Sequence, residues 1–230
     1  MNQPRQQEFW RGARDTFAMM VAAAPFAVIF GTLAGSAGLS LAQAQAMSLV
    51  MYAGSAQFIA VSLFASGTGL AVMWLTTLVV NLRHLLYAAT LLPHVRHLPQ
   101  RWLVPMGFWL TDETFAVVNH RYSEAGSREF AHWYYVGAAL PFYLNWNAWT
   151  LLGLTIGQLF PGLAKMGLDF AMSVTFIGIV VPSLRNRPML AASLSAGLVA
   201  LLAHAWPYKL GLMAAAAAGV AVGLLLEKRQ

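Results

Sequence analysis

A single charged residue, Arg83, interrupts an apolar stretch that runs from residue 70 to residue 92. It is the only formally charged residue between Asp15 and Arg96. At about 1.5 Å per residue, a helix over this stretch places Arg83 roughly 20 Å from one end and roughly 14 Å from the other, near the middle of a hydrocarbon core about 30 Å thick. A guanidinium at that depth costs on the order of 2.5–3.5 kcal/mol and cannot lose its proton to avoid the cost. Arg83 is therefore expected to face a partner or a water-filled cavity, and it marks a candidate functional site.

The composition is that of an integral membrane protein. Of the 230 residues, 59% are hydrophobic and only 10% are charged, and the mean hydropathy is +0.60, outside the range of soluble domains. Seven runs approach or exceed the roughly 20 residues of a spanning helix: 17–38, 41–64, 70–92, 132–160, 166–184, 189–205 and 210–226. An eighth run, 103–119, is short and carries Asp112 and Glu113.

We therefore expect an all-α, polytopic membrane protein with seven or eight transmembrane helices and a single transmembrane domain over residues 1–230. A β-barrel requires alternating apolar and polar residues, and the Ala- and Gly-rich segment 214–222 shows none. The basic residues gather at the ends of the apolar runs, as topology signals do, which argues against nucleic-acid binding. The absence of cysteine excludes disulfides and thiol chemistry.

The distribution of basic residues predicts a cytoplasmic N-terminus, since short cytoplasmic loops are enriched in Lys and Arg. Eight simple spans would nevertheless place Arg96 and Arg101 on the outside. Either the count of basic residues is a weak guide to topology in this chain, or the run 41–64 is broken at Ala53-Gly54-Ser55 and does not cross normally. Both alternatives are open from the sequence alone.

A weak internal repetition divides the chain into possible halves, 9–119 and 130–228. Pro25-Phe26 opens a long apolar run, as Pro141-Phe142 does, and Ala46-Met47-Ser48 recurs as Ala171-Met172-Ser173. Paired halves with broken helices are typical of secondary transporters, whose sites lie near the membrane midplane. Whether the halves are parallel or inverted depends on how the run 103–119 crosses.

Asp112 and Glu113 are the expected partners of Arg83, because they supply intramembrane charge of the opposite sign. On the helix of Arg83, Tyr87 lies on the same face and His84 flanks it. Adjacent residues point about 100° apart, so at most one acid should pair with Arg83. The other is a candidate proton carrier, because a carboxylate removed from water is protonated more easily. The alternatives are a purely structural ion pair and two hydrated acids at the membrane surface.

Other polar residues in apolar runs have two interpretations each. Asn145 beside Trp146 can bond across helices or contact a substrate. Asp169 can stabilise a first helical turn or belong to a site. Ser55 and Gln57 lie in a run of small residues that allows either close helix packing or an unwound backbone, which could hold a carboxylate. The pairs Gly31/Gly35, Gly153/Gly157 and Gly219/Gly223 are explained by helix packing.

No enzyme motif is recognisable. Neither a G-x-S-x-G segment nor an H-E-x-x-H metal pair occurs, so we expect no catalytic residue, no metal and no cofactor. An intramembrane hydrolase would require Ser55 to meet a histidine from another helix.

Four segments carry a family resemblance: Ala53 to Phe58, Asn81-Leu82-Arg83-His84-Leu85-Leu86-Tyr87, Thr111 to Phe115, and Gly167 to Ala171. With them the chain, from about Phe9 to about Lys228, resembles the AzlC family, the large subunit of branched-chain amino-acid exporters. The resemblance implies a bacterial inner-membrane, multi-pass exporter that works with a small membrane subunit of the AzlD family. The positions that match its motifs are Gln57, Asn81, Arg83, His84, Asp112, Glu113 and Asp169.

The residues and the resemblance together suggest proton-coupled export of branched-chain or other hydrophobic amino acids. Arg83, or backbone N–H groups near Ser55, would hold the substrate carboxylate, and Asp112 or Glu113 would carry the proton. A non-transporting membrane scaffold is the alternative from another class. A channel or importer for another small solute is the third.

Overall fold

The computed structural model describes residues 3–123, 130–159, 177, 181, 184, 186–206 and 210–228. All regular secondary structure in this part of the chain is helical, which confirms the all-α prediction. The expected span 166–184 and the Ala171-Met172-Ser173 repeat lie almost wholly outside it. The helices are α1 (Gln3–Ser36), α2 (Leu41–Val50), α3 (Gly54–Ala65), α4 (Leu70–Asn81), α5 (Arg83–Val95), α6 (Gln100–Phe108), α7 (Asp112–Ser123), α8 (Ala131–Leu159), α10 (Arg187–Leu202) and α11 (Leu210–Glu227).

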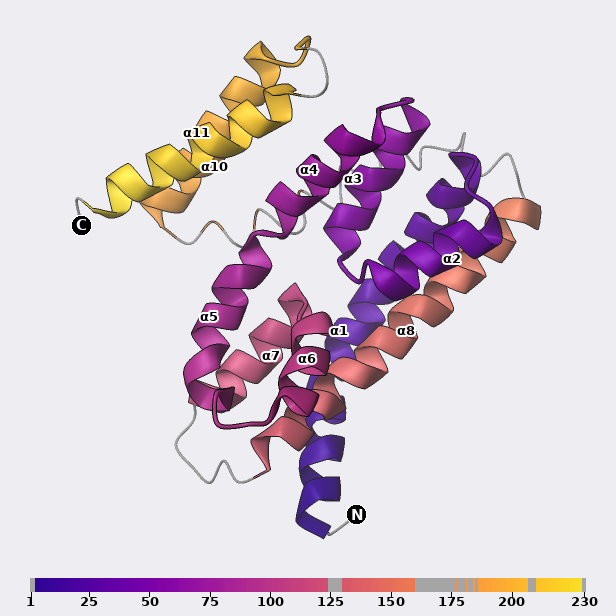
Figure 1. Ribbon diagram of the computed structural model, residues 1–230, viewed down its shortest axis with the longest axis vertical. Coiled ribbons are helices and arrows are strands. Elements are labelled where there is room, and N and C mark those ends of the chain that lie inside the picture. The colour runs from indigo at the N-terminus through magenta and orange to yellow at the C-terminus, as the bar shows by residue number, and fades with distance from the viewer. Residues whose placement is uncertain are drawn as a thin grey trace.

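The two longest helices, α1 and α8, pack against each other along their length and form the spine of the fold (Figure 1). They run parallel, because Gly12 of α1 meets Tyr134 near the start of α8, whereas Gly31 meets Thr150 near its end. At these positions the backbones touch directly, and a Cβ on either glycine would overlap a carbonyl oxygen of α8. Close backbone approach at small residues is a main source of helix association in membranes.

The Gly31 and Gly153 positions confirm the packing interpretation of the glycine pairs. A Cβ on Gly153 would overlap the carbonyl oxygen of Val28. Thr32 Oγ1 also donates to the carbonyl oxygen of Gly153 at 3.0 Å, which ties the two helices at the same level. Gly35 is looser, because a Cβ added there would meet only a Leu154 side-chain atom, 4.0 Å away.

The run 41–64 is broken, as one of the two alternatives predicted. Ser40 begins α2 through a capping box with Gln43, in which each side chain bonds the backbone N–H of the other. Residues 51–53 interrupt the helix, and Ala53 adopts an extended conformation (φ −150°, ψ 93°) just before α3. The break begins two residues before the predicted Ala53-Gly54-Ser55 and includes Ala53, whereas Gly54 and Ser55 form the start of α3.

The two pieces form a re-entrant hairpin, which returns to the end of the molecule where it began. Only residues 37–40 separate α1 from α2, so α2 begins beside the end of α1. Gly54 then lies against Trp146, in the middle of α8. From there α3 leads back toward the end of α1, with the rings of Phe58 and Phe30 5.9 Å apart. The segment 41–64 therefore does not cross the fold.

The helices α4 and α5 together carry the chain across the fold. They are separated only by Leu82, where 3₁₀-type hydrogen bonds tighten the turn. Two stretches among the described residues are long and apolar enough to span a membrane, Pro4–Ser36 and Leu70–Val95. The second carries Arg83 at its centre.

A second re-entrant hairpin, α6–α7, enters from the opposite end. The ring of Trp102 lies 4.7 Å from that of His132, so α6 begins beside the start of α8. Its last residue, Phe108, reaches Tyr143 in the middle of α8, 5.8 Å away between ring centroids. Tyr122 then donates to the carbonyl oxygen of Ala131 at 3.3 Å, so α7 ends where α6 began. The short eighth run 103–119 is not one continuous helix, because the chain leaves the helix at residues 109–111.

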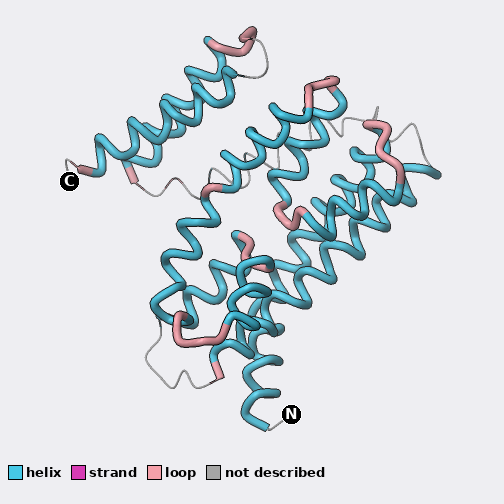
Figure 2. Tube along the Cα trace, in the orientation of Figure 1, coloured by secondary structure: helices cyan, strands magenta, loops and turns pink. Residues whose placement is uncertain are grey.

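The tips of the two hairpins meet near the middle of the molecule, where Figure 2 shows two loops between helix ends. The rings of Tyr52, at the first tip, and Phe108, at the second, are 6.4 Å apart. Non-helical backbone at membrane depth is tolerated where it is enclosed by protein or lines a cavity. The non-helical backbone at these tips is therefore expected to line a cavity, which makes the tips a candidate site.

Except for Arg83, the hairpin topology also brings the arginines of 1–123 to one end. Arg5 lies over the ring of Phe130, 5.6 Å from its centroid, so α1 begins beside the start of α8. Arg96 and Arg101 flank the connection into α6, which lies at the same end. The conflict in the sequence-based topology disappears, because α2–α3 adds no crossing between α1 and α4.

The hairpin α10–α11 stands apart from this bundle, and Figure 1 shows it beside α4. Asn186 begins α10 by accepting a hydrogen bond from the Met189 backbone N–H at 2.9 Å. The two helices pack on each other at Gly219, whose added Cβ would lie 3.1 Å from atoms of Ala192 and Ala196. Of the possible repeat, the structure shows only that α1 and α8, the first helices of the two halves, run parallel.

The α1–α8 contact yields a matched test on one helix. Gly31→Ala should destabilise the protein by about 1–3 kcal/mol, because its new methyl group overlaps the α8 backbone. Gly35→Ala, one turn away, should be neutral or stabilising by up to about 1 kcal/mol, since Ala favours the helix and has room. Denaturant unfolding of the detergent-purified variants measures both. Equal losses would contradict the backbone contact.

Candidate functional site

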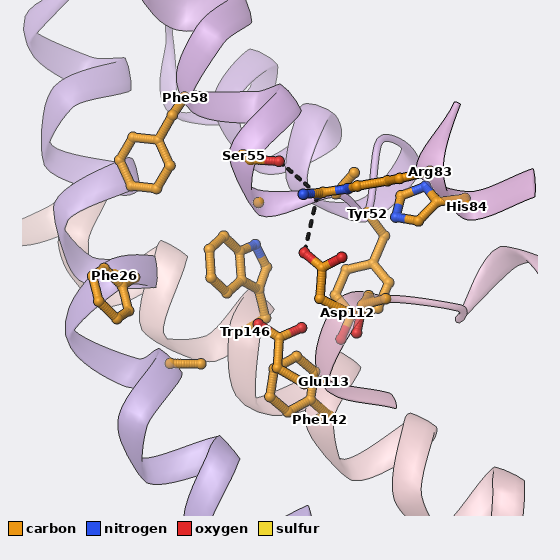
Figure 3. Close-up of a pocket in the computed structure, with 14 residues that line it drawn as sticks. Phe26, Tyr52, Ser55, Phe58, Arg83, His84, Asp112, Glu113, Phe142 and Trp146 are labelled. Atoms are coloured by element: carbon orange, nitrogen blue, oxygen red, sulfur yellow. Dashed lines mark hydrogen bonds and ion pairs between the residues drawn. The ribbon is translucent and has the colours of Figure 1, made fainter. Parts of the chain in front are cut away.

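Three helices begin at the centre of the molecule, and each brings its first residues to one place. The N-terminus of α3 presents Gly54 and Ser55, that of α5 presents Arg83 and His84, and that of α7 presents Asp112. The acids suit the first turn of α7, where the helix dipole favours negative charge. Helix breaks thus place chemically active side chains side by side (Figure 3).

Arg83 reaches across the junction and joins the two hairpins. Its Nη2 donates to Ser55 Oγ at 2.6 Å and lies 3.1 Å from Asp112 Oδ2. About a quarter of the Arg83 side chain and a third of the Asp112 side chain are exposed, so the pair is partly buried. Charge-assisted bonds of this length are stronger than neutral ones. The predicted pairing of Arg83 with one of the two acids is confirmed, and the acid is Asp112.

Tyr87 fixes the other oxygen of the same carboxylate. Its hydroxyl donates to Asp112 Oδ1 at 2.7 Å, and its ring stacks on Phe115 with centroids 4.4 Å apart. Arg83 and Tyr87 are four residues apart and therefore share one face of α5. Asp112 is thus held at both oxygens by neighbours on one helix.

Glu113 lines the same cavity as Asp112. No ion pair joins it to Arg83 among the described residues. The structure thus separates the two acids: Asp112 is fixed by Arg83 and Tyr87, and Glu113 faces the cavity beside it. This division matches the geometric expectation that adjacent helical residues point in different directions.

The cavity at this junction has a volume of about 90 Å³. A single buried water needs roughly 10–15 Å³, so a small polar solute or several waters fit. Its polar side is formed by Ser55, Arg83, His84, Asp112 and Glu113. Its opposite wall is aromatic and is formed by Phe26, Phe58, Phe142 and Trp146. The cavity therefore combines charges of both signs with an apolar surface.

Several buried polar atoms at the cavity wall lack a hydrogen-bond partner among the described residues. They are the hydroxyl of Tyr52, Nε1 of Trp146 and Nε of Arg83. Tyr52 and Trp146 are each only 6% exposed. The start of α3 also has no capping side chain, so its first N–H groups are not capped by protein. Buried polar groups in native proteins are nearly always paired, so these atoms suit a polar ligand.

The other predicted site residues lie elsewhere. Gln57 is fully buried on α3, and neither polar atom of its side chain has a partner among the described residues. Asn81 ends α4 with Oδ1 buried and likewise unpaired in the described part of the chain. Asn145 donates to the carbonyl oxygen of Met20 at 3.0 Å, which is the cross-helix bond that was one of its two interpretations. Asp169 lies outside the described residues.

The sequence did not point to Tyr52 or show which aromatic residues form the wall. Tyr52 directly precedes Ala53-Gly54-Ser55, and Trp146 directly follows Asn145, so both lie beside positions that the sequence had already marked. The packing of Gly54 against Trp146 cannot be inferred from the sequence. In the structure, a Cβ added to Gly54 would lie 3.0 Å from the indole ring. No metal site competes with this interpretation, since no three His, Asp or Glu side chains cluster suitably in the described ranges.

Crossing helices, opposed re-entrant hairpins and a charged cavity between their tips together define a polytopic helical membrane protein with a central cavity. The AzlC protein family matches residues 18–160. The chain belongs to this family.

Three relatives illustrate the similarity. An uncharacterized membrane protein of Archaeoglobus fulgidus is 32% identical over 215 residues, which cover 92% of each chain. The inner membrane protein YgaZ of Escherichia coli is 27% identical over 87% of this chain and 82% of its own. The branched-chain amino acid transport protein AzlC of Bacillus subtilis is 29% identical over 67% of this chain and 59% of its own. No solved structure matches the chain.

The Arg83–Asp112 pair is open to a double-mutant cycle. Arg83→Gln and Asp112→Asn should each destabilise the protein, and the double variant should lose less than the sum, with a coupling of about 1–3 kcal/mol. Unfolding by denaturant in detergent measures each variant. The matched cycle of Arg83→Gln with Glu113→Gln should give a smaller coupling. Equal coupling for both acids would contradict the assignment of Asp112 as the partner.

Proposed function

We propose that this protein exports branched-chain and other hydrophobic amino acids across the bacterial inner membrane. The observation that carries the proposal is the central cavity, in which Arg83 and two acids face an aromatic wall. The transport function named for the Bacillus subtilis relative supports the same substrate class. An amino acid with an apolar side chain presents charges of both signs next to an apolar group, and the cavity offers the complement of each.

The substrate carboxylate binds at Arg83 and the uncapped start of α3. The guanidinium is planar and suits a carboxylate, and the N-terminus of a helix favours negative charge. The ammonium group lies toward Asp112 and Glu113. Since Ser55 and Asp112 already contact Nη2 of Arg83, the substrate competes with them for this group.

The apolar side chain of the substrate packs against Phe26, Phe58 and Phe142. Transfer of each buried CH₂ group from water is worth about 0.8 kcal/mol, so leucine and valine bind better than alanine. Volume sets the upper limit, because the cavity is small and Gly54 already touches Trp146. Large aromatic amino acids should be poor substrates.

Glu113 carries the coupling proton, and Asp112 keeps its pairing with Arg83 and Tyr87. Protonation of Glu113 weakens its hold on the substrate ammonium group and favours release on the other side. Opening alternates between the two hairpins, since each is anchored at a different end of the molecule and both reach the cavity.

The N-terminal end faces the cytoplasm, which the basic residues at that end support. The protein acts as the large subunit of a two-component permease together with a small AzlD-like membrane subunit. Large apolar side chains on α4 and α5, such as Trp74 and Leu86, are exposed and can contact lipid or that subunit.

Arg83→Ala should abolish export of leucine, because no other cation reaches the carboxylate position in the described site. Efflux from preloaded cells lacking other leucine exporters measures this, with and without a co-expressed AzlD-type subunit. Arg96→Ala is the matched control, since Arg96 is exposed at the far end of the same helical stretch and should retain efflux. Retained efflux in Arg83→Ala, with less protein or weaker subunit binding, would favour the scaffold alternative.

Glu113→Gln should separate coupling from movement of the substrate. Uphill export should fall to the level found with an uncoupler, because the variant cannot release and rebind a proton. Exchange of internal for external leucine in proteoliposomes should continue, since it needs no net proton movement. Uphill export unaffected by both the substitution and the uncoupler would contradict proton coupling.

A further inference from the structure

A second cleft lies between α1, α7 and α8, closer to the N-terminal end than the central cavity. It has a volume of about 520 Å³. Arg11 and Asp15 of α1, His120 and Arg121 of α7 and Tyr134 of α8 give it a charged lining. Arg11 and Asp15 are exposed, so the cleft is open to its surroundings.

The cleft and the central cavity follow one line between α1 and α7. On α1, Met19 lines the cleft, and Ala23, one turn further, lines the cavity. On α7, Ala116 lines the cleft, and Glu113, about one turn back, lines the cavity. One helical turn is about 5.4 Å, so the two spaces are separated by about one layer of side chains. That layer contains Met19, a flexible side chain that can move aside.

The cleft holds its charges in a fixed arrangement. Tyr134 donates to Asp15 Oδ2 at 2.7 Å. Arg121 Nη2 lies 3.4 Å from Glu8 Oε2, and its guanidinium lies 5.8 Å from the centroid of the Tyr134 ring. Opposite charges are thus held on facing helices, with an apolar strip beside them. A carboxylate can accept several hydrogen bonds, so the bond from Tyr134 does not exhaust Asp15.

We propose that this cleft is a second binding site, where a zwitterionic amino acid with an apolar side chain is held before it enters the central cavity. It is called the outer site because it lies between the N-terminal end of the molecule and the central cavity, which is the inner site. Asp15 contacts the ammonium group, and the guanidinium groups of Arg11 and Arg121 contact the carboxylate. The apolar side chain lies along Met19 and Val117. The inference rests on the proposed transport of amino acids, but it concerns binding at a separate place.

Because the chain has no cysteine, a single introduced thiol reports on the cleft alone. In purified full-length Ala116→Cys protein, saturating leucine should slow modification by a hydrophilic methanethiosulfonate reagent at least threefold. Ser123→Cys, exposed on the same helix beyond the cleft, is the matched control and should be modified at an unchanged rate. Protection should be lost in Asp15→Asn and kept in Glu227→Gln, which neutralises an exposed carboxylate on α11, outside the cleft.

Two analogues of leucine, each with only one of its charges, test whether the cleft requires a zwitterion. The carboxylate 4-methylpentanoate and the amine 3-methylbutylamine each keep one charge of leucine and should protect far less. Equal protection by either compound would overturn the assignment of Asp15 and the arginines.

Arg83→Ala separates the outer site from the inner one. Leucine should still protect Ala116→Cys in this background, and loss of protection would show that only the central cavity binds. If leucine protects the cleft but neither the wild-type protein nor any variant transports leucine, the proposed function fails and the outer site stands. If leucine never protects the cleft in a protein that transports it, the outer site is wrong.

Discussion

The ion pair between Arg83 and Asp112 is the interaction on which the rest of the structure depends. An arginine in the middle of an apolar stretch cannot lose its proton, so a partner must be brought to its depth. Asp112 meets this need because α6–α7 enters as a re-entrant hairpin and begins α7 at that level. Ser55, at the start of α3, brings the first hairpin to the same guanidinium. One charge therefore fixes where both hairpin tips meet.

The two re-entrant hairpins cost free energy, and their packing against the α1–α8 spine offsets it. Each broken helix leaves backbone groups unpaired at membrane depth, where every unsatisfied group is expensive. The spine supplies a rigid wall against which the tips pack, and its glycines allow the two backbones to touch. The aromatic rings of Tyr52, Phe108 and Tyr143 then enclose the tips. Among the described residues, the uncapped start of α3 and the unpaired hydroxyl of Tyr52 both lie at the cavity.

This arrangement supports the proposed mechanism, in which one site is reached from two sides. The α2–α3 hairpin is anchored at one end of the molecule and the α6–α7 hairpin at the other, yet both tips contribute to the cavity. In the proposed mechanism, a movement of either hairpin changes access on its own side. Arg83 contacts both hairpins, so the proposed competition of a substrate for its guanidinium changes the contacts of both at once.

The sequence by itself determined the membrane class, the need of Arg83 for an acidic partner, a helix interruption near Ala53-Gly54-Ser55 and the close packing at Gly31 and Gly153. These follow from local properties: hydropathy, charge, and the absence of a side chain. Only the tertiary structure decided that α2–α3 and α6–α7 turn back, that Asp112 rather than Glu113 pairs with Arg83, and that Tyr52 and Trp146 line the cavity. The direction a chain takes after a helix break is set by long-range packing against other helices, such as Gly54 on Trp146, and local propensity carries no record of those contacts.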